Sequence, residues 1–185
     1  LKDKLDEKFK DKTIIYRSGD ANHQLLELAN ALKTKKIAAL VFLDPFGMQI
    51  DWNSIENLKD TRSDVWILVP TGVIVNRLLD RAGKLKFSNK LQSFFGLTIE
   101  EIKNYFYTEQ IEQTLFGEEE IITKVQQPIE KIAYLYAERL NTIWKHVTEK
   151  PLVLTNRNGT PIFHLIFASN NQNALKIAKQ IILNT

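Results

Sequence analysis

Apolar residues fall into short runs separated by polar turn residues, and this spacing predicts alternating strands and helices. The run at 38–43 has the length of a strand buried on both faces of a parallel sheet. The predicted strands of the first half are residues 13–17, 38–43 and 65–69. The helices predicted by helical spacing are residues 22–33, 52–58 and 73–81. This alternation predicts an α/β fold with a parallel sheet and right-handed crossovers.

From residue 88 onward the pattern is mainly helical and then returns to strands. The predicted helices are residues 88–95, 98–107 and 128–147, with an exposed turn at Gly117 and a final helix at 174–182. Thr98 and Glu101 have the spacing of a capping box. Strands at 151–155 and 161–168 flank Asn158-Gly159, which favours a tight antiparallel hairpin. Ser169 or Asn170 is expected to cap the final helix.

These elements predict one α/β core with an insertion. Residues 1–87 and 148–185 form the core, and residues 88–147 form a helical insertion before the C-terminal hairpin. Residues 1–12 resemble the end of a helix already under way, which suggests that the chain starts inside a domain.

Turn residues follow each of the first three predicted strands. They are Gly19-Asp20, then Asp44-Pro45 and then Gly72. The carboxyl ends of parallel strands meet at one edge of a sheet, and ligands bind at that edge in open α/β folds. We therefore expect Asp20, Asp44 and Gly72 to share one rim. The alternative is that turns between strands and helices simply favour Gly, Pro and Asp.

Each rim residue has a chemical role and a structural one. Asp20 can accept a hydrogen bond from an exocyclic amine such as that of adenine, it can cap the following helix, or it can do both. Asp44 can orient a substrate amine or hydroxyl or bind a metal, or it can stabilise its own turn. Phe46 can stack on a flat substrate or pack in the core. Gly47 and Gly72 permit close backbone approach to a ligand, or satisfy turn geometry.

The amino-acid composition excludes several classes of protein. The chain has 185 residues and a net charge of +3, and its lack of cysteine excludes disulfides and thiolate metal sites. No apolar run approaches the length of a membrane span, so we expect no membrane association and a cytoplasmic protein. A strand ending in Asp is also typical of P-loop nucleotide hydrolases, but the phosphate-binding loop is absent from this chain.

A basic run follows the third predicted strand. Its residues are Arg77, Arg81, Lys84, Lys86 and Lys90, opposed only by Asp80. Such a run can guide a nucleic acid or phosphorylated substrate toward the predicted rim. The structural alternative, a solvated helix face and loop, is the more common role of such a run.

Four segments together resemble the family of three-Cys-motif partner proteins. They are GDAN at 19–22, LVFLDPFGMQ at 40–49, VIVNRLL at 73–79 and FHLIFASN at 163–170. Members of this family look like class I S-adenosylmethionine-dependent methyltransferases with a Rossmann-like sheet. The family is named for its genomic association with a neighbouring radical-SAM-like protein that bears three cysteines.

The resemblance assigns roles to the rim residues. Gly19, Asp20 and Ala21 would follow the third strand of the methyltransferase sheet, where an acidic side chain meets the adenine of the cofactor. Asp44, Pro45 and Phe46 would follow the fourth strand, where amino-methyltransferases hold the target amine. In those enzymes the motif has two prolines and then an aromatic residue. Here Phe46 replaces the second proline and Gly47 stands where the aromatic belongs, so the chain matches this motif only in part.

The first two strands of that sheet, with the glycine-rich cofactor loop, have no counterpart in the chain. The resemblance therefore predicts that these residues alone do not bind S-adenosylmethionine. It implies a methyltransferase-like protein acting on a nucleic acid or a protein. The alternative is a non-catalytic module that binds the neighbouring three-cysteine protein, with the insertion at 88–146 as its contact surface.

Overall fold

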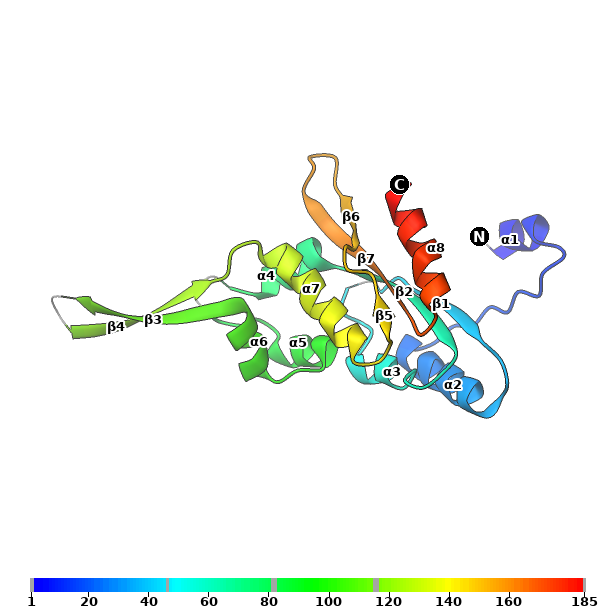
Figure 1. The fold of residues 1–185 in the computed structure, drawn as a ribbon, viewed down its shortest axis with the longest axis horizontal. Coiled ribbons are helices and arrows are strands. Elements are labelled where there is room, and N and C mark those ends of the chain that lie inside the picture. The colour runs from blue at the N-terminus through cyan, green and yellow to red at the C-terminus, as the bar shows by residue number, and fades with distance from the viewer. Residues whose placement is uncertain (1, 46, 81–82, 115–116, 185) are drawn as a thin grey trace.

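The computed structural model describes residues 2–45, 47–80, 83–114 and 117–184. In these ranges the chain is an α/β protein with a mixed five-stranded sheet, a separate two-stranded hairpin and surrounding helices (Figure 1). Its strands are β1 (Ala39–Leu43), β2 (Ser63–Val69), β3 (Tyr107–Thr114), β4 (Gly117–Lys124), β5 (His146–Val147), β6 (Leu152–Thr155) and β7 (Pro161–Ser169). Its helices are α1 (Lys2–Lys8), α2 (Ala21–Thr34), α3 (Trp52–Glu56), the π-helix η1 (Thr71–Val75), α4 (Asn76–Leu78), α5 (Ser88–Phe95), α6 (Ile99–Phe106), α7 (Pro128–Asn141) and α8 (Gln172–Leu183). Within these ranges, every helix is too short or too polar to cross a bilayer.

The sheet is mixed because only its first two strands are parallel. β1 lies beside β2 with Val41 opposite Val65. β2 pairs antiparallel with β7, which pairs antiparallel with both β5 and β6. The predicted parallel pairing is therefore confirmed for 38–43 and 65–69, and the predicted C-terminal hairpin is the β6–β7 pair.

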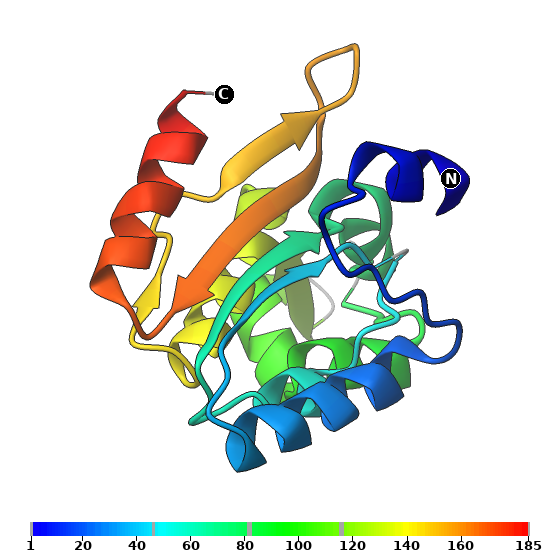
Figure 2. The same ribbon diagram turned by 90° about the vertical axis from the view of Figure 1, so that its right-hand side faces the viewer.

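β1 is buried on one face, and the expectation of burial on both faces is wrong. Val41 and Leu43 join the main core, which also contains residues of α2, α3 and α7. Leu40 is 71% exposed and Phe42 is 62% exposed. Successive side chains of a strand point to opposite faces, so Leu40 and Phe42 lie on the face opposite that core. Figure 2 shows β1 at the margin of the sheet, with α2 on its core side.

The strand predicted at residues 13–17 is also wrong. This segment is irregular and connects α1 to α2, with Ile15 73% exposed. The hydroxyl of Tyr16 donates a hydrogen bond to Asp6 of α1 (3.0 Å), which holds the segment against that helix. A strand needs a neighbour to satisfy its backbone groups, and in the described ranges none pairs with this segment.

Two paired antiparallel strands occupy residues 107–114 and 117–124, where the sequence pattern indicated only the end of a helix and an exposed turn. We call β3 and β4 together the arm; it projects from the body in Figure 1. The expected turn at Gly117 is instead the start of β4. The region 88–147 therefore holds three helices, the arm and β5 in its described residues. The β-branched residues Ile111, Ile121 and Ile122 favour strands, but the glutamates between them weaken the signal.

The long helix predicted to reach residue 147 ends at Asn141. Trp144 is buried and its indole N–H donates to the backbone oxygen of Ser63 (3.1 Å), which draws the chain toward β2. The next backbone N–H, of Lys145, donates to Asn170 Oδ1 (3.0 Å). These tertiary contacts redirect the chain into β5.

The predicted helix caps had mixed outcomes. The capping box of Thr98 and Glu101 is confirmed in α6. The cap of α8 is Asn171, which accepts from the N–H of Asn173 (2.9 Å), and the expected cap at Ser169 or Asn170 is wrong. The hydroxyl of Ser169 instead donates to Asp64 and accepts from the N–H of Asn171. Pairing with β2 thus keeps Ser169 in the strand.

Tyr107 anchors the base of the arm and should couple stability to alkaline pH. Its hydroxyl donates to the backbone oxygen of Asp80 (2.7 Å). Burial, followed by the charge of Asp80, raises the pKa of Tyr107 to about 12. The unfolded phenol titrates near its ordinary pKa of about 10, so the unfolded chain loses this proton first as pH rises.

The contribution of Tyr107 should therefore be complete below pH of about 10 and decline as pH rises toward 12. We expect urea unfolding midpoints to fall less steeply with alkaline pH in Tyr107→Phe than in the wild type. Parallel curves for the two proteins across the alkaline range would contradict this expectation.

Candidate functional site

A cavity of about 470 Å³ lies where β1 and β2 end. It is lined by Asp44, Pro45, Gly47, Leu68, Val73, Ile74 and Phe163. Asp44 is the charged member of this set, and the other lining residues are apolar or glycine. The cavity is at the carboxyl edge of two parallel strands, which is the edge at which the sequence predicted a ligand.

The first wall follows directly from the end of β1. Pro45 has no N–H and cannot continue the strand, so the chain leaves the sheet directly after Asp44. Pro45 is buried, whereas Asp44 is exposed at the mouth of the cavity. Gly47 has a φ of +91° and turns the chain back toward Ile74. Phe46, the third predicted catalytic residue, lies outside the described residues.

The second wall is the π-helix η1, where an ordinary helix over 73–81 was expected. Its first residue, Thr71, is buried. The hydroxyl oxygen of Thr71 lies 2.7 Å from Nδ1 of His164, which is also buried. Burial lowers the pKa of His164, with an opposing contribution from Glu130, and the imidazole is therefore neutral at pH 7. This contact ties η1 to β7 while Val73 and Ile74 face the cavity. Short π-helical turns are frequent at functional sites.

The residues predicted to bind the cofactor do not line this cavity. Asp20 is exposed, and its carboxylate caps α2 by accepting from the N–H of His23 (3.0 Å). Gly19 precedes it in irregular chain, and Ala21 is the exposed first residue of α2. The predicted rim is therefore confirmed for Asp44 and Gly72, which follow parallel strands, whereas Asp20 follows no strand.

The N-terminus of α2 nevertheless lies beside the loop that follows β1. The side-chain amide of Asn22 donates to the backbone oxygen of Gln49 (2.9 Å). Its side-chain oxygen accepts from the N–H of Asp51 (2.8 Å). These two hydrogen bonds fix the start of α2 to the loop that carries Gly47.

The predicted basic run is exposed in its described members, Arg77, Lys84, Lys86 and Lys90. The ammonium group of Lys90 lies 3.8 Å from Asp51. Arg81 lies outside the described residues.

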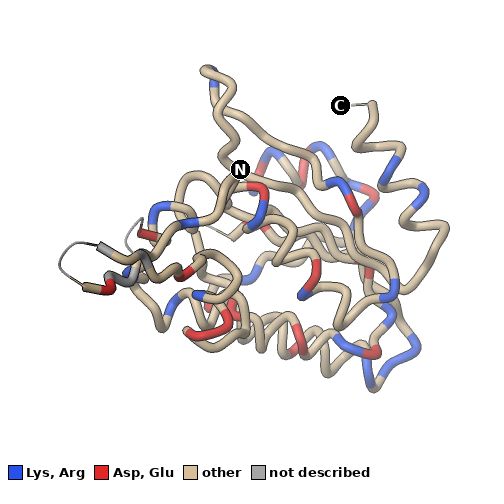
Figure 3. The backbone as a smooth tube through the Cα atoms, turned by 60° about the vertical axis from the view of Figure 1, so that its left-hand side comes forward, with Lys and Arg blue, Asp and Glu red and all other residues tan. Residues whose placement is uncertain are grey.

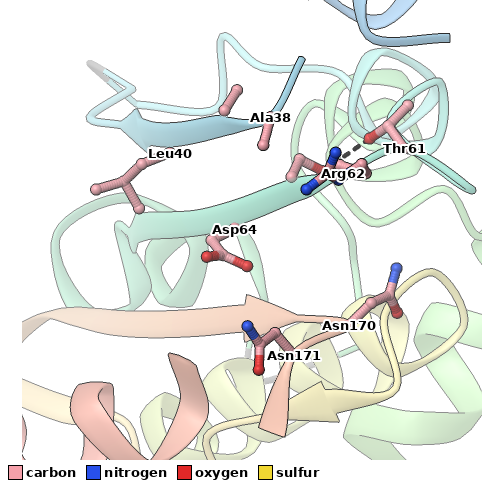
Figure 4. A pocket seen from close by; sticks show the side chains of 9 residues that line it. Ala38, Leu40, Thr61, Arg62, Asp64, Asn170 and Asn171 are labelled. Carbon is pink, nitrogen blue, oxygen red and sulfur yellow. Dashed lines mark hydrogen bonds between the residues drawn. The ribbon is translucent and has the colours of Figure 1, made fainter. Parts of the chain in front are cut away.

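A second cavity, of about 410 Å³, lies at the opposite edge of the sheet (Figure 4). Asp64, Asn170 and Asn171 from β2 and the turn before α8 line it. Each already has a structural partner: Asp64 accepts from Ser169, Asn170 accepts from the N–H of Lys145, and Asn171 caps α8. Their chemistry is explained by the fold, so the cavity beside Asp44 is the stronger functional site.

Among the residues that the structure describes, the site holds no arrangement typical of a metal centre. Across the described ranges, no group of three or more His, Asp or Glu side chains is placed to hold a metal ion. The metal-binding alternative for Asp44 therefore has no supporting ligands among those residues.

Comparison of the chain with protein-family models, curated proteins and solved structures found no match. The cavity itself thus carries the functional assignment. Sequence reasoning found Asp44 and Pro45 but missed Leu68 and Phe163 as lining residues. Leu68 reads as an ordinary strand residue, and Phe163 reaches the site only through the antiparallel pairing of β7 with β2.

Proposed function

We propose that the cavity beside Asp44 is the acceptor site of an S-adenosylmethionine-dependent methyltransferase-like protein. Its occupant is a planar aromatic molecule with an amino group, such as a nucleobase. The observation that carries the proposal is a single carboxylate at the mouth of an apolar cavity at the carboxyl ends of β1 and β2. Its volume of about 470 Å³ suits a small planar molecule.

The chemistry of the lining residues gives each a role. The carboxylate of Asp44 accepts hydrogen bonds from the amino group and so orients the nitrogen that is to be modified. Pro45 and Phe163 offer apolar surface to the flat body of the acceptor. Val73 and Ile74 close the far wall and exclude water from it.

The described residues do not fit the cofactor itself. Asp20, to which the resemblance assigns the adenine contact, caps α2 and is outside the lining of the cavity beside Asp44. The strand that should precede Asp20 is absent from the described segment 13–17. We therefore assign to this chain the acceptor side of the reaction and not the cofactor side.

The open margin of β1 supports the methyltransferase-like interpretation. In the Rossmann-like arrangement β1 is an inner strand with a neighbour on each side. In the described residues β1 pairs with β2 alone, and its side chains Leu40 and Phe42 are largely exposed. An uncovered apolar margin of this kind favours pairing with a further strand, which we propose completes the sheet.

Binding of a planar amine tests the proposed site. We expect adenine to shift the backbone amide resonances of Gly47, Val73 and Ile74 in a saturable titration. Purine, which lacks the amino group, should bind more weakly. Asp44→Asn should weaken adenine binding by about tenfold, since a hydrogen bond to a charged group contributes about 1.5–3 kcal/mol.

Asp60→Asn is the matched control, because Asp60 is exposed and lies away from the cavity, and it should leave binding unchanged. Equal binding by the Asp44→Asn variant, or no shifts at the cavity, would contradict the proposal. Calorimetry of the chain with S-adenosylmethionine should show no binding, and micromolar affinity would overturn the assignment of the acceptor side alone.

A further inference from the structure

The arm is firmly attached at its base. Lys124 donates from its ammonium group to Asn76 Oδ1 (2.8 Å) and to the backbone oxygen of Leu79 (2.7 Å). Tyr107, opposite Lys124, adds its bond to Asp80, and Ile122 packs against Gly83. The eight paired residues of each strand extend about 26 Å at roughly 3.3 Å per residue.

The outer half of the arm lacks comparable support. Ile111 is 71% exposed and Ile121 is 36% exposed. Glu118 is exposed, and no ion pair joins it to another described side chain. An isolated two-stranded hairpin is at best marginally stable in water, so the outer half needs a covering surface.

The charge of the arm identifies the chemistry of that surface. Residues 107–124 contain five glutamates and one lysine and carry a net charge of −4, so the rest of the chain carries +7. Four of these glutamates lie in the outer part, and three of them are consecutive in β4 (118–120). The complementary surface is basic and contains an apolar contact for Ile111.

A basic surface of this kind lies at the base of the same arm. Arg77, Lys84 and Lys86 are exposed and flank the segment that holds Tyr107 and Lys124. Figure 3 shows acidic positions on the arm and both basic and acidic positions on the body. The acidic tip is separated from the basic residues at the base by the length of the arm. The tip of an arm therefore cannot pair with the basic residues of the same molecule.

We propose that two copies of this chain form a symmetric dimer with their arms antiparallel. A twofold axis across the middle of the arms places each acidic tip on the basic base of the partner. The two contacts are identical, as an isologous interface requires, and Ile111 is covered near the axis. This interface lies apart from the cavity beside Asp44 and does not depend on the proposed function.

Sedimentation measurements test the dimer. We expect the 21.4 kDa chain to sediment at about twice this mass at low salt, with a dissociation constant that rises with ionic strength. The arm variant Glu118→Lys/Glu119→Lys/Glu120→Lys and the body variant Lys84→Glu/Lys86→Glu should each raise the dissociation constant at least tenfold. Far-UV circular dichroism confirms that each variant is folded.

Mixing these two variants provides the decisive measurement. Each variant alone opposes like charges at both contacts, whereas the mixed dimer opposes unlike charges at both, so mixing should restore the dimer. The control variants Glu56→Lys and Lys176→Glu change exposed charges on α3 and α8 and should not alter assembly.

A wild-type monomer at low salt would overturn the proposal. A dimer that persists in both variants would show that another surface assembles the chain, and would also overturn it. If the arm variant fails to fold, the body variant alone must still lose the dimer.

Discussion

Replacing Gly96 with alanine should lower the free energy of unfolding by about 2–5 kcal/mol, from the sum of backbone strain and overpacking. Gly96 ends α5 in the left-handed conformation, with a φ of +63°, and its N–H donates to the backbone oxygen of Gln92 (2.7 Å). A side chain in this conformation brings Cβ close to the carbonyl oxygen. At Gly96 the new Cβ would also overlap the indole of Trp52.

Trp52 has little room to move away from such a methyl group. It is buried, and the guanidinium of Arg139 lies 4.6 Å from the centre of its ring. Arg139 in turn donates to the backbone oxygens of Phe95 (2.9 Å) and Gly96 (3.1 Å). A shift of Trp52 would therefore disturb the same side chain that satisfies the end of α5.

Gly159→Ala separates the two contributions. Gly159 has a φ of +76°, but a Cβ there would have no atom within 4 Å. This variant should cost only the strain, about 1–2 kcal/mol. Urea unfolding of both variants measures the difference, and equal losses would show that the overlap with Trp52 is relieved without cost.

The elements that the sequence predicted are those fixed by local chemistry. The run at 38–43 and the spacing at 22–33 gave β1 and α2, and Thr98 with Glu101 gave the start of α6. The elements that were predicted wrongly depend on contacts between residues that are far apart in the sequence. Segment 13–17 has strand-forming residues, but no described strand pairs with it, and the helix after Pro128 ends where Trp144 reaches Ser63.

The same distinction between local and distant contacts applies to the residues of the candidate site. Asp44 and Pro45 stand out because a charged residue and a residue without an N–H follow an apolar run. Leu68 and Phe163 come together through the antiparallel register of β2 and β7, which a local pattern does not encode. The π-helical turn of Val73 and Ile74 depends on the contact between Thr71 and His164, which are 93 residues apart.

The same turn gives the second large prediction, because Gly72 lies where η1 meets β7. A Cβ at Gly72 would overlap the backbone oxygen of Pro161 and crowd Cα of Ile162. These are backbone atoms at the start of β7 and cannot rotate away. Gly72→Ala should therefore lower the free energy of unfolding by about 1–3 kcal/mol, and Gly72→Val should lower it further.

Gly159→Ala also serves as the comparison here. The backbone angles of Gly72 are ordinary, whereas those of Gly159 are left-handed, so strain alone would make Gly159→Ala the more harmful change. If close packing against β7 is the reason that position 72 needs glycine, the Gly72→Ala variant should also displace η1 from β7. The amide resonances of Val73 and Ile74 should then shift in Gly72→Ala and stay fixed in Gly159→Ala. Unchanged resonances with full stability in Gly72→Ala would mean that η1 is not held against β7, and the far wall of the cavity would lose its support.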